Sequence, residues 1–282
     1  MEMVTVQTSE TAAWKGPDRR REPRRVLLSP ADFRHFVRSV PKVAAGITRM
    51  GVRQAKQSDV SELLRVEEAS WPEGARATKE MLASRIEVFP EGVLCATENG
   101  AIVGFSCWEI VAEQPKEIHG SWAKLTDGGT IRRTHRRDGS TLFGVSLSIL
   151  PRAPKDTVWA IGEAARKLTI RRGLPWAALG SRIPRFHRFS NRMNVKEYLF
   201  RRNGSKHVDP ELDLYIRIGL TPVRALPNFF PDPPSCNYGV LVEWRNPFTE
   251  ISDQLDVWEA YRWFHLWEHK TRRRRSDGGH KA

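Results

Sequence analysis

The chain has 282 residues, and its 46 Lys and Arg residues exceed its 33 Asp and Glu residues to give a formal net charge of +13. A hydrophobic content of 40% with 9% aromatic residues excludes a wholly disordered chain, and 20 glycines and 18 prolines are too few for a fibrous or low-complexity protein. The length fits one large domain or two small ones with a sizeable core.

Membrane, secreted and metal-binding classes are not expected. No apolar run approaches the roughly 18 residues of a membrane span, and the first residues lack the charged-then-apolar layout of a secretory signal. The three cysteines, Cys95, Cys107 and Cys236, are not closely spaced, and the eight histidines show no metal-binding spacing. We therefore expect no disulfide framework, no metal cofactor and a cytoplasmic location.

Positive charge is unevenly distributed along the chain. Residues 1–46 and 271–282 each have a formal charge of +4, and residues 182–206 have +7, so that the rest sums to −2. We expect a near-neutral body with one basic patch, a basic N-terminal extension over 1–46, and a Trp-rich helix with a basic tail over 249–282. The extensions are either solvated ends or docking segments for a partner.

The first half of the body predicts a strand, two helices and a hairpin. Residues 47–54 indicate a strand, and a helix begins at Ser58 or Asp59, either of which is a suitable N-cap. A second amphipathic helix is expected over about 77–88. Two β-rich runs then flank Asn99-Gly100, which is a strong hairpin signal.

The second half continues with strands and crossover helices after a polar stretch over 113–140. We expect strands over 140–151, 174–184, 220–226 and 237–245, and helices over 156–172, 209–218 and 251–270. The element order β-α-α-β-β-β-α-β-α-β-β predicts an α/β fold with one mixed central sheet and helices on both faces.

Three segments within residues 47–248 add a family resemblance. They are the strand Phe143 to Pro151, the segment Leu214 to Leu220, and Gly180 to Arg188. In their order and spacing they resemble the GNAT (GCN5-related N-acetyltransferase) superfamily, and the third is similar to a Gly-Arg-Ile-Pro-Gly-Tyr-His-like segment of one subgroup. The resemblance implies a single GNAT-like domain over 47–248, with the fourth and fifth strands splayed beside the helix at 156–172.

The resemblance also implies an acyl transfer from a thioester. The backbone of Leu147, Ser148 and Ile149 in the fourth strand would hold the thioester, with an N–H group polarising its carbonyl. Tyr215 matches the tyrosine with which many relatives protonate the leaving thiolate. The alternative for Tyr215 is a packing role between helix and sheet.

An acceptor site would be lined by the end of the first helix and by the segment after the fifth strand. Glu67, Glu68 and Trp71 are expected in the former, although Trp71 is also a core candidate. His187 would act as a base or as a hydrogen-bond donor to a carboxylate, and Arg182, Arg185 and Arg202 would bind a carboxylate or phosphate. The alternative is a solvated basic surface.

The expected cofactor loop departs from the family pattern. Lys155, Thr157 and Trp159 stand where small residues normally let backbone N–H groups approach a pyrophosphate. Pro154 lacks a donor, and Asp156 adds a negative charge near an anion site. Arg152 and Lys155 supply compensating positive charge. We therefore expect weak binding of free coenzyme A.

Three functional hypotheses follow. The first is an acyltransferase, with a biosynthetic pathway as one setting, that moves an acyl group to an amine or another nucleophile. The donor would be acyl-CoA or the phosphopantetheine of an acidic acyl carrier protein. The second is a polyketide-type malonyl-thioester decarboxylase, in which His187 with Arg201 or Arg202 would hold the carboxylate. The third is a non-catalytic GNAT fold used for partner binding. Nucleic acid is not expected as a partner, because the extensions show no interleaving of aromatic and basic residues.

Overall fold

The computed structural model describes residues 50–246 and 249. The predicted N-terminal extension and the Trp-rich helix at 251–270 lie outside these described residues. Within the described residues, no helix has both the length and the apolar character needed to cross a membrane.

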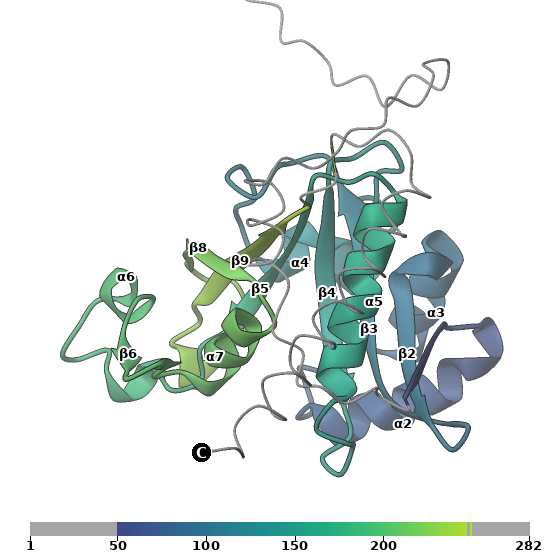
Figure 1. Cartoon of the computed structure of the whole chain (residues 1–282), viewed down its shortest axis with the longest axis horizontal. Helices are drawn as coiled ribbons and strands as arrows, with labels where there is room; N and C mark the ends of the chain where they lie inside the picture. The colour runs from purple at the N-terminus through teal and green to yellow at the C-terminus, as the bar shows by residue number, and fades with distance from the viewer. Residues whose placement is uncertain (1–49, 247–248, 250–282) are drawn as a thin grey trace, which may run out of the picture.

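A seven-stranded mixed sheet organises the domain, in the order β1-β2-β3-β4-β5-β9-β8 (Figure 1). Its strands are β1 (Gly51–Gln54), β2 (Val93–Glu98), β3 (Ala101–Val111), β4 (Thr141–Ile149), β5 (Trp176–Arg182), β8 (Thr221–Leu226) and β9 (Gly239–Arg245). The β4–β5 pair is parallel and the other neighbouring pairs are antiparallel. A parallel pair needs a crossover, and helix α5 (Thr157–Arg171) supplies it.

Helices cover both faces of the sheet, as the sequence predicts. The longer helices besides α5 are α2 (Val60–Ser70), α3 (Lys79–Val88) and α7 (Pro210–Arg217). Side chains of β4 alternate between faces, with Ser148 bonded to α2 and Leu147 packed with Ile161 of α5. Therefore α2 and α5 lie on opposite faces of the sheet.

Local sequence explains where these elements begin and turn. Asp209 caps α7 by accepting hydrogen bonds from two backbone N–H groups, and Thr78 caps α3 in the same way. The β2–β3 turn has positive φ at both Asn99 (51°) and Gly100 (84°), the conformation that this dipeptide favours. The predicted hairpin is therefore confirmed.

Several short elements were not predicted. They are α4 (Trp122–Leu125), α6 (Val195–Tyr198), β6 (Arg202–Asn203) and β7 (Lys206–His207), with 3-10 turns η1 (Gln57–Asp59), η2 (Pro90–Gly92), η3 (Asp127–Gly129), η4 (Phe186–Arg188) and η5 (Pro233–Ser235). Two- to four-residue elements have too few positions to show a periodic hydrophobic pattern, so the sequence does not reveal them.

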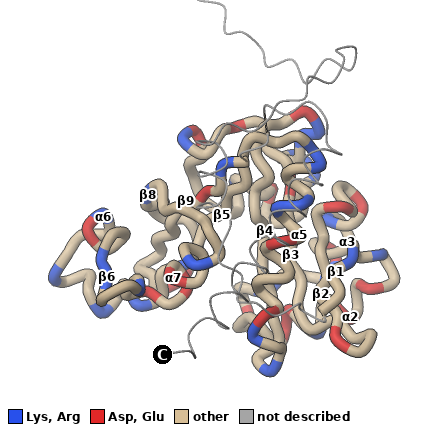
Figure 2. Tube along the Cα trace, viewed as in Figure 1, with Lys and Arg blue, Asp and Glu red and all other residues tan. Residues whose placement is uncertain are grey.

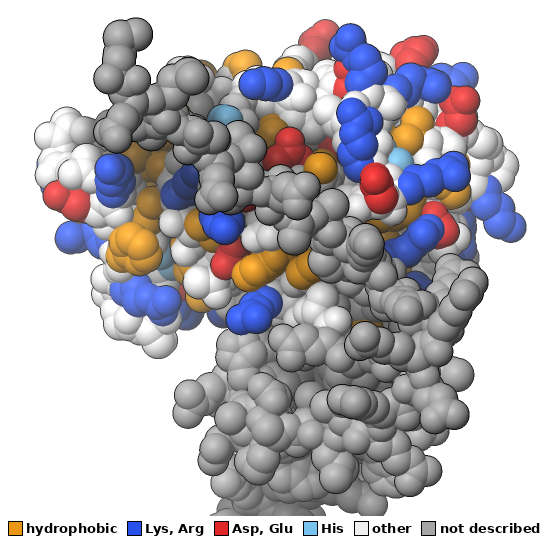
Figure 3. Space-filling model, turned by 90° about the horizontal axis from the view of Figure 1, so that it is seen from above, with side chains coloured by type: hydrophobic (Ala, Val, Ile, Leu, Met, Phe, Trp, Pro, Cys, Tyr) orange, Lys and Arg blue, Asp and Glu red, His pale blue; other side chains and the backbone are white. Residues whose placement is uncertain are grey.

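Residues 184–208 between β5 and α7 form a projection that we call the basic arm. Figure 2 shows Lys and Arg positions along it around α6 and β6, at one end of the molecule. Its interior is the buried Tyr198, whose hydroxyl donates to Asp209 and whose carbonyl lies 3.1 Å from His207 Nε2. On the face of the molecule in Figure 3, by contrast, basic and acidic side chains are intermixed.

Candidate active site

Strands β4 and β5 separate at a β-bulge. Cys107 and Trp108 are consecutive in β3 but pair with Ser146 and Gly144, so that Val145 is an extra residue in β4. Pairing between β4 and β5 stops at Gly144, whereas β5 continues beside β9 to Arg182. The splay between the fourth and fifth strands is thus confirmed, and the bulge is its local cause.

Backbone groups of β4 face this gap. The Ser70 hydroxyl donates to the carbonyl of Ile149 (3.1 Å), and the indole of Trp122 donates to the carbonyl of Val145 (2.8 Å). These carbonyls therefore point away from β3. Because backbone groups alternate along a strand, the N–H of Leu147 points into the gap as well.

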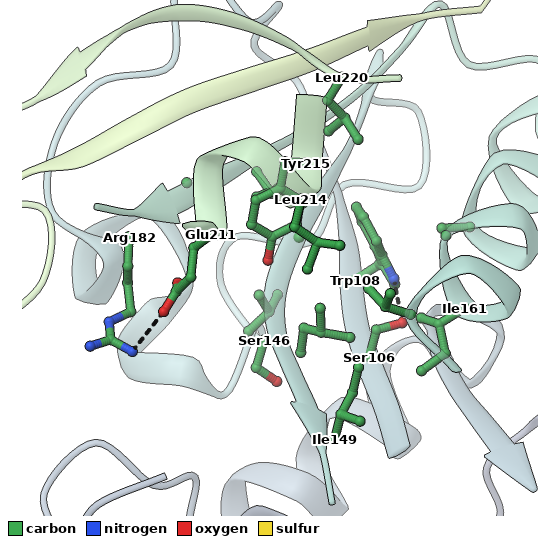
Figure 4. A pocket seen from close by; sticks show the side chains of 18 of the residues that line it. Ser106, Trp108, Ser146, Ile149, Ile161, Arg182, Glu211, Leu214, Tyr215 and Leu220 are labelled. Carbon is green, nitrogen blue, oxygen red and sulfur yellow. Dashed lines mark hydrogen bonds and ion pairs between the residues drawn. The ribbon is translucent and has the colours of Figure 1, made fainter. Parts of the chain in front are cut away.

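A cavity of about 330 Å³ occupies the gap. Its walls come from the central strands, from the α2 segment on one face, and from α5 and α7 on the other, and most of the lining side chains are apolar (Figure 4). The lining includes Glu67, Trp71, Arg85, Ser106, Trp108, Ser146, Leu147, Ile149, Ile161, Gly162, Ala165, Ala177, Arg182, Glu211, Leu214, Tyr215, Ile218, Leu220 and Trp244.

On the α2 face, a chain of hydrogen bonds orients a buried carboxylate. The Trp71 indole donates to the Ser148 hydroxyl (3.0 Å), which donates in turn to Glu67. The other oxygen of Glu67 accepts from the backbone N–H of Ala77 (2.8 Å). Glu67 is 1% exposed yet lines the cavity, so its carboxylate is a positioned acceptor within the site.

A buried guanidinium lies on the same face. Arg85 donates to the carbonyl of Gly129 (2.7 Å) and to the hydroxyl oxygen of Ser146 (3.0 Å). Ser146 accepts this bond, so its own proton remains to be donated elsewhere. The arginine thereby orients a hydroxyl of the cavity wall.

On the opposite face, α7 contributes Tyr215 and Glu211, which lie one helical turn apart. Figure 4 shows the Tyr215 hydroxyl pointing into the cavity. Burial raises the pKa of Tyr215 above its usual range, so the phenol holds its proton at neutral pH. Burial also raises the pKa of Glu211, which accepts a hydrogen bond from Arg182 (3.3 Å).

The structure brings one group of the expected site residues together. Tyr215, Leu147, Ile149, Trp71 and Arg182 line the cavity. The guanidinium of Arg182 lies 5.3 Å from the Trp71 ring centroid and is bonded to Asp232 by two hydrogen bonds. The remaining β4 residue, Ser148, is buried behind the wall and acts on the site through Glu67.

Other expected site residues lie outside the cavity lining. Glu68 is exposed on α2, and Arg152 and Lys155 are exposed at the start of α5. Arg185 and Arg202 are exposed on the basic arm. The structure therefore does not bring these side chains to the gap between β4 and β5.

His187 also lies outside the cavity lining, in contrast to its expected place at the acceptor site. It is exposed on η4, and its Nδ1 lies 2.9 Å from the carbonyl of Pro184 and 3.0 Å from that of Pro234. Because both neighbours are acceptors, this nitrogen carries the proton and fastens the turn to the η5 loop. The turn holds the ring at the surface.

Arg85, Ser146 and Glu211 were not expected in the site from the sequence, whereas Glu67 was expected there beside Glu68. Glu67 follows Val60 by seven residues and Leu63 by four, so helical spacing places it on the apolar face of α2 and places Glu68 outside that face. The pattern therefore favours Glu67 over Glu68 as the carboxylate of the site. No local pattern joins Arg85 to Ser146, because the contact depends on the packing of α3 against β4.

Comparisons with known proteins agree with this architecture. No protein-family model matches the chain. The chain is 32% identical over 203 residues to the uncharacterized N-acetyltransferase YkwB of Bacillus subtilis, covering 70% of the chain and 89% of that protein. It is 28% identical over 200 residues to the probable hydrolase YhcX of the same organism, but these cover only 39% of that protein and 70% of the chain.

Two solved structures share the fold at low sequence identity. The loading GNATL domain of CurA from Lyngbya majuscula superposes with a TM-score of 0.63 at 20% identity, over 71% of this chain and 98% of that domain. The GphF GNAT-like decarboxylase, solved in complex with isobutyryl-CoA, gives a TM-score of 0.59 at 24% identity, over 70% of this chain and 99% of its own.

Proposed function

The chain belongs to the GNAT superfamily and is an acyltransferase, and from this premise we propose that it moves an acyl group from a thioester to an amine or another nucleophile within the cavity between β4 and β5. The observation that supports this most directly is the Val145 bulge, which opens a gap where the Leu147 N–H faces a cavity with Glu67 on one side and Tyr215 on the other.

The proposed reaction uses three groups of this chain. The Leu147 N–H donates to the thioester carbonyl oxygen and stabilises the negative charge that develops there. The acceptor nitrogen forms a bond to the carbonyl carbon, and the bond between carbon and sulfur breaks. The leaving thiolate takes the proton of the Tyr215 hydroxyl, which the buried phenol retains until that step.

Glu67 is the proposed acceptor of the amine proton. Its carboxylate lies on the face opposite α7, so that base and acid flank the gap from two sides. The hydrogen bonds from Ser148 and Ala77 hold it in one orientation. A proton reaches it directly or along the Ser148 hydroxyl, which gives its own proton to Glu67 as it receives one.

The donor is proposed to be acyl-CoA or an acyl group on the phosphopantetheine of an acidic carrier protein. The start of α5 supports the carrier. The Thr157 N–H is already bonded to the Pro154 carbonyl (3.0 Å), and the Thr157 side chain is buried, so this backbone donor is not open to a pyrophosphate. A carrier delivers the same arm without the nucleotide.

Decarboxylation of a malonyl thioester is the second candidate function. The buried Arg85 behind Ser146 favours it, because a guanidinium near the cavity wall attracts a carboxylate. In that reaction the bond to the carboxylate carbon breaks, its electron pair passes to the thioester enolate, and a proton completes the acetyl thioester. The exposed His187 and Arg202 would not hold the carboxylate in this arrangement.

One experiment separates the two reactions. The full chain is incubated with acetyl and malonyl thioesters of both coenzyme A and a carrier protein, with and without a panel of amines. We expect acylated amine and free thiol from the acetyl donors. Carbon dioxide with an acetyl-thioester product, and no acylated amine, would favour decarboxylation instead, and neither product from any donor would contradict both.

A further inference from the structure

The cavity extends beyond the gap between the strands. Pairing of β4 with β5 ends at Gly144 opposite Leu179, yet Ala177, which still pairs with Leu142, lines the cavity. Ala165 in the C-terminal half of α5 lines it as well. The space therefore continues past the open gap and beneath α5.

Small residues form the floor and roof of this extension. The guanidinium of Arg166 on α5 lies 5.9 Å from the centroid of the Trp244 ring, so that this ring faces α5. Ala177 is the β5 partner of Trp244 and lies on the same face of the sheet. Opposite them, α5 presents Gly162 and Ala165.

The roof leaves room at Gly162. A Cβ atom built on Gly162 would find its nearest neighbour, Ile218 Cδ1, 3.6 Å away. That distance is an ordinary van der Waals contact, so no backbone or side chain is pressed against this turn of α5. The side walls here include the apolar side chains of Trp108 and Leu220, and Figure 4 shows Trp108 and Ile161 across the cavity from Leu214 and Tyr215.

Most polar groups lie at the other part of the cavity, although Arg166 also lines the extension and donates to the Ile218 carbonyl, and the buried Trp244 indole nitrogen has no hydrogen-bond partner among the residues that the structure describes. Glu67, Arg182 and Glu211 surround the open part of the cavity, where β4 and β5 are unpaired. In the extension, Trp108 gives its N–H to the Ser106 hydroxyl (2.7 Å), which leaves its ring as an apolar surface. A reacting thioester carbonyl at the Leu147 N–H would thus have an apolar recess beside it.

We propose that this extension is an acyl-chain pocket and that the enzyme prefers an aliphatic acyl group of about four to six carbons over acetyl. The inference rests on the proposed acyl transfer and specifies its donor. Burying one methylene is worth roughly a fourfold change in an equilibrium or rate constant. A chain two methylenes longer than acetyl should therefore be favoured by about fifteenfold, and a chain that is too long for the recess should lose this advantage.

The test compares acetyl, butyryl, hexanoyl and decanoyl thioesters on the full chain by kcat/KM for thiol release with one amine acceptor. We expect butyryl or hexanoyl to exceed acetyl by at least about fifteenfold, and decanoyl to fall below them. Ala177→Leu should fill the recess and bring the ratio of butyryl to acetyl kcat/KM down to about one. Ala177→Val is the milder variant if leucine impairs folding.

Ala164→Leu is the matched control, because Ala164 is on α5, the helix above the extension, but does not line the cavity. It should keep the wild-type chain-length preference. Acetyl transfer at least as fast as butyryl transfer would overturn the acyl-chain pocket and leave the proposed function intact. Absence of turnover with every thioester would overturn the proposed function and this inference together.

Discussion

Tyr215 is a half-buried tyrosine whose hydroxyl points into a mostly apolar cavity, and at the scale of single residues it gives the sharpest prediction. Tyr215→Phe should lower the rate of acyl transfer by roughly 10²- to 10⁴-fold, the usual contribution of a general acid, with donor binding little changed. Single-turnover kinetics and a donor titration measure the two effects separately.

The control for Tyr215 is Tyr238→Phe, which removes a hydroxyl outside the cavity lining. It should leave the transfer rate unchanged. A loss below about threefold in Tyr215→Phe would make Tyr215 a packing residue, the alternative that its sequence position also allowed.

Glu109 gives a prediction on stability and pH. It is buried in β3, and burial raises the pKa of its carboxyl to about 8, against the opposing effects of the Thr134 hydroxyl and the Arg85 guanidinium. In the unfolded chain its pKa is about 4.3. Between about pH 4.3 and 8 the Glu109 carboxyl is therefore ionised in the unfolded chain but still protonated in the folded protein. The free energy of unfolding should therefore fall across this window by up to about 1.4 kcal/mol per pH unit from this group.

Glu109→Gln removes that titration. Denaturant unfolding at pH 5 and pH 8 should show that the variant loses less stability than wild type between the two values, whereas Glu68→Gln, a change at an exposed position of α2, should follow wild type. Equal losses in the Glu109 variant and wild type would show that the carboxyl titrates normally in the folded protein.

At the scale of a single element, we expect the turn before α5 to determine which acyl donor the protein binds. Asp156 is the N-cap residue of α5 and makes no side-chain capping bond, so its carboxylate adds negative charge at a helix start without a capping benefit. We expect free coenzyme A to bind weakly, with a dissociation constant above about 1 µM. A dissociation constant of about 1 µM corresponds to a binding free energy of roughly −8 kcal/mol.

Asp156→Ser should tighten coenzyme A binding several-fold in calorimetry, because it removes a charge that repels phosphate and keeps a residue that can cap the helix. Glu163→Gln, two turns along α5, is the matched change of charge. Sub-micromolar binding by the wild-type chain would show instead that Arg152 and Lys155 rebuild a phosphate site.

At the scale of the whole molecule, the important feature is the uneven distribution of positive charge. The segment 182–206 has a charge of +7, and the basic arm carries most of it away from the body, with Phe200 exposed at 69%. An acidic carrier should meet the arm first, steered by a field that reaches about 10 Å at 0.1 M salt. Arg188→Glu combined with Arg192→Glu should slow association about tenfold at low salt.

The same double change should leave the melting temperature nearly unchanged, since exposed charges contribute little to stability. Lys116→Glu with Lys124→Glu alters the net charge equally on exposed positions outside the arm and serves as the control in stopped-flow association. Equal slowing by both pairs would show a general effect of net charge, and an unaltered rate in the arm variant would exclude docking there.

The order of strands and helices could be predicted from the sequence, because it depends on local properties. Alternating and helical hydrophobic patterns, the Asn99-Gly100 turn and the N-caps each act over a few residues, and the structure confirms the β-α-α-β-β-β-α-β-α-β-β order. Tyr215 and Leu147 were expected from the family resemblance, because short motifs around them match the family's late helix and fourth strand.

The composition of the site depends on contacts between residues that are far apart in the chain. Glu67 with Ser148, and Arg85 with Ser146, join positions 81 and 61 residues apart, and only the packing of α2 and α3 on β4 brings them together. His187 shows the converse, because its surface position depends on carbonyl groups of Pro184 and Pro234, the latter 47 residues away. The sequence by itself thus determined the elements, the sheet and the family resemblance, whereas the tertiary structure decided which charges face the cavity and how far its apolar recess extends.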